Sequence, residues 1–195
     1  MEKLEIDSIA ELLKKRKTNS HKGDFGHALL IAGNAQKMGA AIIASKACLR
    51  SGSGLLTISI PKEERNAIFS TIPETMLFFR EDGIDFSLYN AIGIGPGLSQ
   101  EEAAQKLVYS VLLKAISPVV FDADALNILA KNQNWLYQLP KNSILTPHPK
   151  EFDRLFGDHI SEDERSTTAI QKATKLNCTI VLKGHKTFIT DGIHS

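Results

Sequence analysis

The residues best suited to chemistry stand just after strand-like apolar runs, at five points along the chain. Glycines occupy the first two points, and carboxylates, a histidine and a lysine occupy the others: Gly33, Gly95, Gly97, Asp122, Asp124, His148 and Lys183. In an open parallel sheet all strands have their carboxyl ends along one edge, and such sheets bind their ligands there. The five points together predict a single ligand site along one sheet edge.

Two turns of small residues suit close approach of a ligand to the backbone. In Gly93-x-Gly95-x-Gly97 the glycines permit positive φ, and the helix expected over 100–115 follows, so its free amide groups could face an anion. The spacing is not that of a Rossmann dinucleotide motif, and taken alone the segment is more often a plain strand-to-helix turn. Gly39-Ala40-Ala41 opens another helix, where small side chains would let a planar ligand pack or would simply favour helix formation.

Two carboxylates and an amide gather at the start of a later helix, at Asp122, Asp124 and Asn127. Asp124 and Asn127 are three residues apart and share a helix face. Together they could hold magnesium-bound water or a ligand hydroxyl, since magnesium usually takes one or two carboxylates plus phosphates. Either aspartate could instead only cap the helix.

The turn Thr146-Pro147-His148-Pro149 holds a histidine between two prolines. The prolines restrict the backbone, so His148 is a candidate hydrogen-bond donor, acid or base. The alternative is a plain surface turn. Glu151 stands in the first turn of the next helix, where an acid also simply complements the helix dipole.

The stretch Lys183-Gly184-His185-Lys186-Thr187 joins two strand-like runs. It lacks the residue order of a Walker A loop. An ammonium group and free backbone amides can still bind phosphate, and the alternative is a basic hairpin turn.

The elements that must position these residues alternate between strand and helix. Nearly continuous apolar runs, typical of parallel strands buried on both faces, cover 27–32, 56–60, 91–94, 119–121, 143–145 and 179–182. Helical stretches lie between them, at 39–50, 62–69, 100–115, 123–130, 150–156 and 162–176. This alternation predicts an α/β fold with a mostly parallel central sheet and helices on both faces. An edge strand is expected over 75–79, and an antiparallel hairpin over 179–190, near the tight-turn pair Asp191-Gly192.

Composition favours one ordinary globular domain. The 195 residues are 43% hydrophobic, and 23 basic residues nearly balance 22 acidic ones, so no net charge marks a nucleic-acid or membrane-surface binder. We expect an amphipathic helix over 7–17 within an N-terminal segment 1–20, followed by the domain 21–195. Cys48 and Cys178 form no metal or disulfide motif and are expected as buried free thiols. With no signal peptide or apolar span in the sequence, we expect a cytoplasmic protein.

Taken together, these residues resemble the ADP- or ATP-dependent NAD(P)H-hydrate dehydratases of the ribokinase-like superfamily. The matching stretches run in order along the chain, at 21–27, 39–41, 93–98, 121–127, 145–151 and 181–185. The resemblance implies a ribokinase-like fold and a lyase that repairs nicotinamide cofactors. It restores NADH or NADPH from the S-form of its hydrate by phosphorylating the ring hydroxyl and eliminating phosphate.

The resemblance also implies site residues, co-substrates and partners. Ala40, Gly97 and His148 would bind the hydrate, and the nucleotide would lie along Lys183, Gly184, His185, Lys186 and Thr187. Asp124, Asn127 and Glu151 would arrange magnesium and phosphate. The implied co-substrate is ADP or ATP with Mg²⁺, and the implied assembly is a homo-oligomer, commonly a tetramer.

The sequence contains no Gly-x-Gly-Asp turn, which in the family forms the phosphoryl anion hole and carries the catalytic aspartate. We therefore identify no catalytic residue, and we expect the 195 residues to be a fragment or shortened form with little activity. Two other functions stay open at this point. One is a small-molecule kinase of the same superfamily, and the other is a non-catalytic nucleotide-binding or assembly module.

Overall fold

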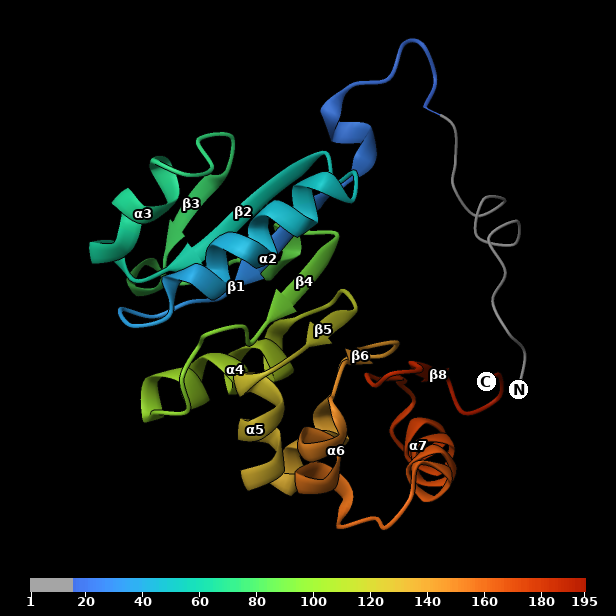
Figure 1. The fold of residues 1–195 in the computed structure, drawn as a ribbon. Helices are drawn as coiled ribbons and strands as arrows, with labels where there is room; N and C mark the ends of the chain where they lie inside the picture. Colours follow the sequence, from blue (N-terminus) through green and yellow to red (C-terminus); the bar gives the residue numbers. More distant parts are fainter. Residues whose placement is uncertain (1–15) are drawn as a thin grey trace.

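The computed structural model describes residues 16–195; residues 1–15 are drawn as a thin grey trace in Figure 1. The helix expected over 7–17 therefore lies, except for its last two residues, outside the described residues. None of the described helices has the length and apolar character needed to cross a membrane.

The described strands form one eight-stranded sheet in the order β3-β2-β1-β4-β5-β6-β7-β8. Every neighbouring pair is parallel except β7 and β8, which are antiparallel. The strands are β1 (His27–Ile31), β2 (Leu55–Ile60), β3 (Met76–Phe79), β4 (Ala91–Ile94), β5 (Val119–Phe121), β6 (Ile144–Leu145), β7 (Thr179–Leu182) and β8 (Phe188–Thr190). This confirms the mostly parallel α/β sheet, its edge strand β3 and its C-terminal antiparallel pair (Figure 1).

The strand order reverses between β1 and β4. From β1 the chain first builds outward through β2 to β3, then returns to pair β4 with the other side of β1. The loops that leave the carboxyl ends of β1 and β4 lead to α2 and α4, which belong to two different core clusters. The point where these loops meet, at Gly33, Ala40 and Gly97, is called the crevice below. Open α/β sheets bind their ligands at such a point.

The expected helices are all present, within one or two residues of their predicted bounds except α3, which begins three residues later than predicted. They are α2 (Met38–Arg50), α3 (Arg65–Phe69), α4 (Glu102–Lys114), α5 (Asp124–Lys131), α6 (Pro149–Phe156) and α7 (Glu162–Leu176), with a 3-10 turn η2 (Lys62–Glu64) leading into α3. Four further 3-10 turns have no counterpart among the expected elements: η1 (Lys22–Phe25), η3 (Arg80–Asp82), η4 (Phe86–Leu88) and η5 (Gln133–Gln138).

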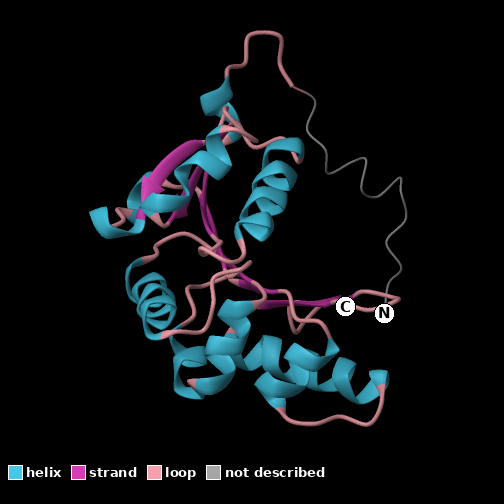
Figure 2. Ribbon diagram, turned by 60° about the vertical axis from the view of Figure 1, so that its left-hand side comes forward, coloured by secondary structure: helices cyan, strands magenta, loops and turns pink. Residues whose placement is uncertain are grey.

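The helices pack on both faces of the sheet, as expected. Apolar residues of α2 and α3 pack with Ile58 and Ile60 of β2 in one core cluster. Residues of α4, α5, α6 and α7 pack in a larger cluster around Phe121 of β5 and Phe152 of α6, both fully buried. These helices line the sheet in Figures 1 and 2 and hold the loops that follow each strand.

Coverage of the sheet is uneven near β8. On the face opposite α4–α7, Val120 of β5 and Ile189 of β8 are 36% and 43% exposed. In Figure 2, the described helices lie on one side of the strand pair that ends at the C-terminus. Ile189 is thus exposed, whereas Val181 and Phe188 of the same strand pair are half-buried.

Two local expectations need correction. The pair Asp191-Gly192 is not the turn that joins β7 to β8; it follows β8, where the Asp191 carboxylate accepts hydrogen bonds from the Ile193 and His194 amides. Cys178 is buried, and burial raises the pKa of its thiol to about 12. Cys48, in α2, is only partly buried, so the expectation of a buried thiol is wrong for this residue.

Candidate functional site at the carboxyl edge of the sheet

Two glycine turns meet at the crevice between β1 and β4. The Gly33 amide, just after β1, donates a hydrogen bond to the Pro96 carbonyl at 2.8 Å, and the Gly95 amide donates to the Ile31 carbonyl at 3.1 Å. Gly33, Gly95 and Gly97 all have positive φ, at 75°, 129° and 65°. The backbone therefore closes tightly at the predicted ligand edge, in conformations that glycine adopts without strain.

Space as well as conformation requires glycine in the second turn. A methyl group at Gly95 would overlap the Asp122 carbonyl oxygen, and one at Gly97 would lie 2.8 Å from the Lys37 carbonyl oxygen and 2.9 Å from the Ala40 methyl carbon. Two residues predicted to bind the hydrate, Ala40 and Gly97, are therefore direct neighbours across the crevice. The close approach fits both a ligand site and a plain strand-to-helix turn, so the role of Ala40 and Gly97 stays a prediction.

Asp124, at the start of the helix that follows β5, contacts residues on both sides of the same crevice. Its carboxylate, largely buried at 9% exposure, accepts hydrogen bonds from the Ser99 amide at 2.9 Å and from Lys37 Nζ at 3.3 Å. Ser99 adopts positive φ to present that amide. The capping alternative is wrong for both aspartates, because the residue before α5 is Ala123 and no side chain caps this helix.

A second ion pair joins the ends of β5 and β7. Lys183 Nζ lies 2.7 Å from Asp122 Oδ1, and the Lys183 amide donates to the Pro147 carbonyl at 2.8 Å. The Asp122 amide in turn donates to the Ile94 carbonyl at the end of β4. The predicted points after β1, β4, β5, β6 and β7 are thus linked in one series of contacts along a single edge.

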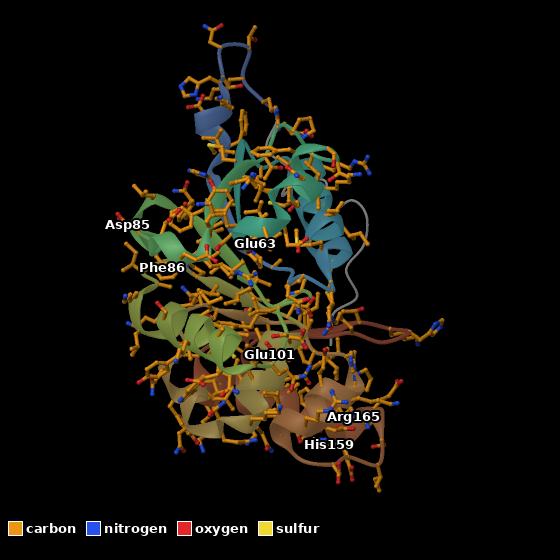
Figure 3. The ribbon with its side chains drawn as sticks, turned by 90° about the vertical axis from the view of Figure 1, so that its left-hand side faces the viewer. Glu63, Asp85, Phe86, Glu101, His159 and Arg165 are labelled. Atoms are coloured by element: carbon orange, nitrogen blue, oxygen red, sulfur yellow. The ribbon has the colours of Figure 1, made fainter. Side chains whose placement is uncertain are left out.

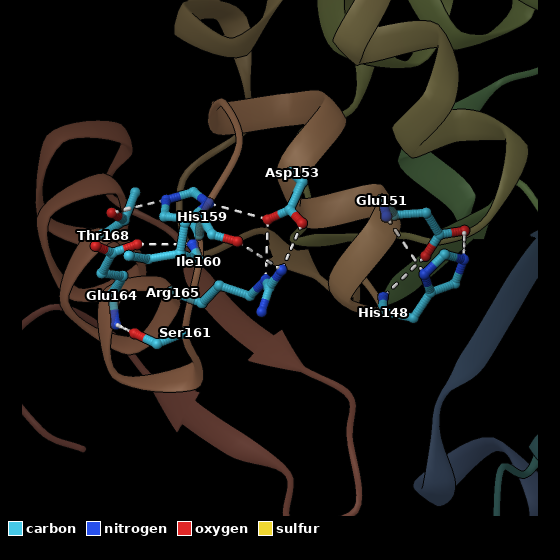
Figure 4. Close-up of polar contacts among 9 residues, drawn as sticks. All are labelled: His148, Glu151, Asp153, His159, Ile160, Ser161, Glu164, Arg165 and Thr168. Atoms are coloured by element: carbon cyan, nitrogen blue, oxygen red, sulfur yellow. Dashed lines mark hydrogen bonds and ion pairs between the residues drawn. The ribbon is translucent and has the colours of Figure 1, made fainter.

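His148 caps α6 together with Glu151 (Figure 4). The His148 amide donates to Glu151 Oε2 at 2.9 Å, and His148 Nδ1 accepts from the Glu151 amide at 3.3 Å. Glu151 is buried, whereas the His148 side chain is 46% exposed. Since Nδ1 accepts a hydrogen bond, a neutral His148 ring carries its proton on Nε2. The capping pair holds this ring at the end of β6.

The three residues predicted to arrange magnesium and phosphate are already engaged with protein groups. Asp124 holds Ser99 and Lys37, Glu151 caps α6, and Asn127 Oδ1 accepts from Arg154 at 2.9 Å. Among residues 16–195, no three His, Cys, Asp or Glu side chains gather closely enough to hold a metal ion. The residues present do not fit a magnesium site held by the protein alone, and their role toward phosphate stays a prediction.

Comparison with known proteins decides the family. Residues 28–193 match the model of a protein family described as NAD(P)H-hydrate dehydratase. This chain belongs to that family. It is 35% identical over 199 residues to the ADP-dependent (S)-NAD(P)H-hydrate dehydratase of Listeria monocytogenes, with 98% of this chain and 70% of that protein covered.

Solved structures agree with the family assignment. A ribokinase-like superfamily protein from Enterococcus faecalis superposes with a TM-score of 0.86 at 29% identity, over 95% of this chain and 67% of that one. The ADP/ATP-dependent NAD(P)H-hydrate dehydratase of Bacillus subtilis, co-crystallised with ATP and Mg²⁺, superposes with a TM-score of 0.82 at 35% identity, over 96% and 68%. The ribokinase-like fold is confirmed, and neither alternative function is favoured by these matches.

In this member of the NAD(P)H-hydrate dehydratase family, hydrogen bonds and an ion pair from the neighbouring helix α7 and the loop before it hold helix α6 in place. Arg165 of α7 donates to both carboxylate oxygens of Asp153, at 2.9 and 2.7 Å, and His159 bridges Asp153 to Thr168. The hydrogen bonds from Arg165 hold the pKa of the Asp153 carboxyl below its usual range. Figures 3 and 4 show His159 and Arg165 together in the helix layer. This network ties α7 to the helix that begins at His148.

Sequence reasoning missed several residues of the edge. Lys37 and Ser99 hold Asp124, and Arg80, directly after β3, donates to the Ala32 and Gly33 carbonyls at 2.8 and 2.7 Å. A signal for Arg80 was present, since it follows the predicted edge strand as the other site residues follow theirs. Within the stretch predicted to bind the nucleotide, Lys183 contacts other residues at the carboxyl edge of the sheet, while residues 184–187 are exposed.

Proposed function

We propose that this chain carries out the nucleotide-dependent dehydration of the S-form hydrates of NADH and NADPH, a carbon–oxygen lyase reaction that repairs these cofactors. Its turnover is expected to be low, because these 195 residues contain no Gly-x-Gly-Asp turn. The observation that carries the proposal is the close contact of Ala40 with Gly97 at the reversal of strand order. This contact brings together two residues predicted to bind the hydrate, in a chain whose family is established.

The proposed chemistry explains why a nucleotide is needed. Hydroxide is a poor leaving group, so direct loss of water from the hydrated ring is slow. Transfer of the terminal phosphoryl group of ADP or ATP to the ring hydroxyl breaks a P–O bond of the nucleotide and releases AMP or ADP. The hydroxyl proton is lost to solvent, and a phosphate ester remains. The carbon–oxygen bond then breaks, phosphate leaves with the former hydroxyl oxygen, and the neighbouring carbon loses a proton as the ring double bond returns.

The protein's part in this proposal is positioning. The Ala40–Gly97 crevice would receive the flat ring, because neither residue places a side chain beyond a methyl group there. The half-exposed ring of His148 has its Nε2 atom 3.4 Å from Glu151 Oε1. In the complex, Nε2 would turn from Glu151 to the hydrate and donate a hydrogen bond to it. The exposed amides of 184–187 and the Lys183 ammonium would face the nucleotide phosphates.

The function is tested by mixing the chain with NADPH hydrate and ADP or ATP and following the absorbance of reduced nicotinamide. Recovery of that absorbance with release of phosphate supports the proposal. A phosphorylated product that persists would indicate a kinase instead. Nucleotide binding with neither product would indicate a non-catalytic module.

Replacing His148 with Ala should weaken binding of the hydrate by roughly 1–3 kcal/mol, the usual cost of losing a polar contact at a site. Calorimetry with NADPH hydrate measures this directly. His21→Ala is the matched control, because His21 precedes η1 with a similar capping partner, Asp24, at the opposite edge of the sheet. Equal hydrate affinity in the two folded variants would remove His148 from the site.

Replacing Lys183 with Ala should lower the affinity for ADP and ATP about tenfold or more, because a charge-assisted contact to phosphate is lost. The control is Lys106→Ala, which removes another lysine from a 2.7 Å ion pair, with Glu102, on the surface of α4. Calorimetric titration with each nucleotide compares the two. Unchanged nucleotide affinity in a folded Lys183 variant would leave only the hairpin-turn interpretation.

Three further parts of the proposal go beyond the site itself. Mg²⁺ enters as the usual companion of nucleotide phosphates. A cytoplasmic location is supported by the two free cysteines. We also propose that the protein forms a homo-oligomer, the tetramer that the family resemblance implies. The division of the chain into an N-terminal segment 1–20 and a domain 21–195 likewise stays a proposal.

A further inference from the structure

A groove opens beside the crevice, between the start of α4 and helices α5 and α6. Its volume is about 400 Å³, and its lining residues are Gln100, Asn127, Ala130, Lys131 and Arg154. Two of them reach the residues already described. Gln100 Nε2 lies 3.4 Å from Asp124 Oδ1, and Arg154 Nη1 donates to Asn127 Oδ1 at 2.9 Å. The groove is therefore continuous with the Asp124 side of the crevice.

The groove carries positive charge that no carboxylate of the described residues is seen to neutralise. The cations of the crevice itself are paired, Lys37 with Asp124 and Lys183 with Asp122. Arg154 contacts instead a neutral amide oxygen, and Lys131, at the end of α5, enters none of the ion pairs found within residues 16–195. Both side chains are exposed at the groove, so they are available to an anion from solvent.

Asn127 gives the guanidinium of Arg154 a fixed orientation. The hydrogen bond occupies one nitrogen, Nη1, and leaves the other donors of the planar guanidinium free to make parallel bonds to a phosphate. Gln100 and Lys131 supply further donors around the same space. The donor set thus suits a phosphate group better than an uncharged ligand.

We propose that this groove binds a phosphate of the dinucleotide substrate while the ring occupies the neighbouring crevice. The inference rests on the proposed function. The adenine nucleotide is a second source of phosphate, because its predicted stretch begins at Lys183, which pairs with Asp122 at the end of β5. The groove instead contacts Asp124, through Gln100. The groove lies on the Gly97 and Asp124 side, so the pyrophosphate of the hydrate is the phosphate that it favours.

The test replaces Lys131 and Arg154 together with Gln. The matched control replaces Lys114 and Lys141 with Gln, which removes the same charge from exposed positions that precede β5 and β6, at the opposite edge of the sheet. NADH hydrate, NADPH hydrate and ADP are titrated calorimetrically into each protein, at low and at raised salt.

We expect the groove variant to bind both hydrates about tenfold more weakly than the wild type at low salt, with the difference shrinking as salt screens it. ADP affinity should change less than twofold, and the control should match the wild type throughout. Loss of ADP affinity with hydrate binding unchanged would assign the groove to the nucleotide and overturn the proposal. Unchanged affinity for every ligand would overturn it as well.

The same titrations separate this inference from the proposed function. A wild-type chain that binds hydrate without turning it over would contradict the function, and the groove would still be judged by hydrate affinity. Normal turnover with wild-type binding in the groove variant would contradict only the groove. A wild-type chain that binds no hydrate would contradict both.

Discussion

Gly95→Ala should destabilise the fold by about 3–5 kcal/mol, the sum of a strained backbone conformation and overpacking of a tight contact. The added methyl group would overlap the Asp122 carbonyl oxygen. That oxygen belongs to the backbone and accepts the Ala125 amide at 3.1 Å, at the start of α5. Gly95 also has a φ of 129°, which a residue with a side chain rarely adopts.

The neighbouring chain cannot move aside at low cost. The Asp122 amide is bonded to the Ile94 carbonyl, and the Asp122 carboxylate holds Lys183. Displacing Asp122 would therefore pull on β4, α5 and β7 together. For a domain of this size, the loss corresponds to a melting temperature lower by roughly 10 °C or more.

Gly39→Ala is the control for the added methyl group. Gly39 lies in the first turn of α2, and a methyl group there would meet no heavy atom within 4 Å. Because alanine is the better helix former, this variant should be unchanged or up to about 1 kcal/mol more stable. Urea unfolding of both variants gives the comparison. A Gly95 variant as stable as the Gly39 variant would show that the edge is loosely packed.

The fold could be predicted from the sequence because a buried parallel sheet leaves a plain signal. Each strand from β1 to β7 is short and mostly apolar, and all but the edge strand β3 contribute buried residues, so their places were predicted within one or two residues. The same rule placed the chemistry, because residues that follow parallel strands share one edge. The contact between Ala40 and Gly97 realises that expectation for residues nearly 60 positions apart.

The hydrogen-bond partners of the site residues could not be predicted from the sequence. Nothing in the spacing of Asp124 says that its carboxylate turns back to the Ser99 amide rather than capping its own helix. That choice depends on how the glycine turn packs, which only the assembled sheet decides. The 3-10 turns were missed for a related reason, since segments of three to six residues carry too little periodicity to be recognised.

Arg80 is the residue whose importance the structure reveals most clearly. Its Nη2 group donates to the carbonyl oxygens of Ala32 and Gly33, and more weakly to that of Ser59 at 3.4 Å. These oxygens belong to the ends of β1 and β2. Burial lowers the pKa of the guanidinium to about 10, so it remains charged near neutral pH. Arg80 thereby clamps the loop whose Gly33 amide holds Pro96.

Arg80→Met should therefore destabilise the fold by about 2–4 kcal/mol and also weaken hydrate binding. The methionine fills similar volume and removes the cost of burying a charge, but it leaves the Ala32 and Gly33 oxygens without their donor. Each unsatisfied buried acceptor costs about 1–3 kcal/mol, and two of them outweigh the gain from removing a charge that is only partly desolvated. The loss of the clamp lets the Gly33 loop and the glycine turn beside Ala40 separate.

Two further variants, Arg80→Lys and Arg50→Met, show whether loss of the Arg80 hydrogen bonds causes the lower stability and the weaker hydrate binding. Lysine keeps the charge and can reach only part of the carbonyl set, so we expect it to fall between the wild type and Arg80→Met in both stability and hydrate affinity. Arg50 lies exposed in the last turn of α2. The Arg50→Met variant therefore measures the effect of losing a surface arginine, and it should leave stability and hydrate affinity unchanged. Thermal unfolding and calorimetric titration with NADPH hydrate measure the two. If Arg80→Met lost stability but bound the hydrate as the wild type does, Arg80 would support the sheet without positioning the crevice, because the loops between β1 and β4 would have kept their geometry without it.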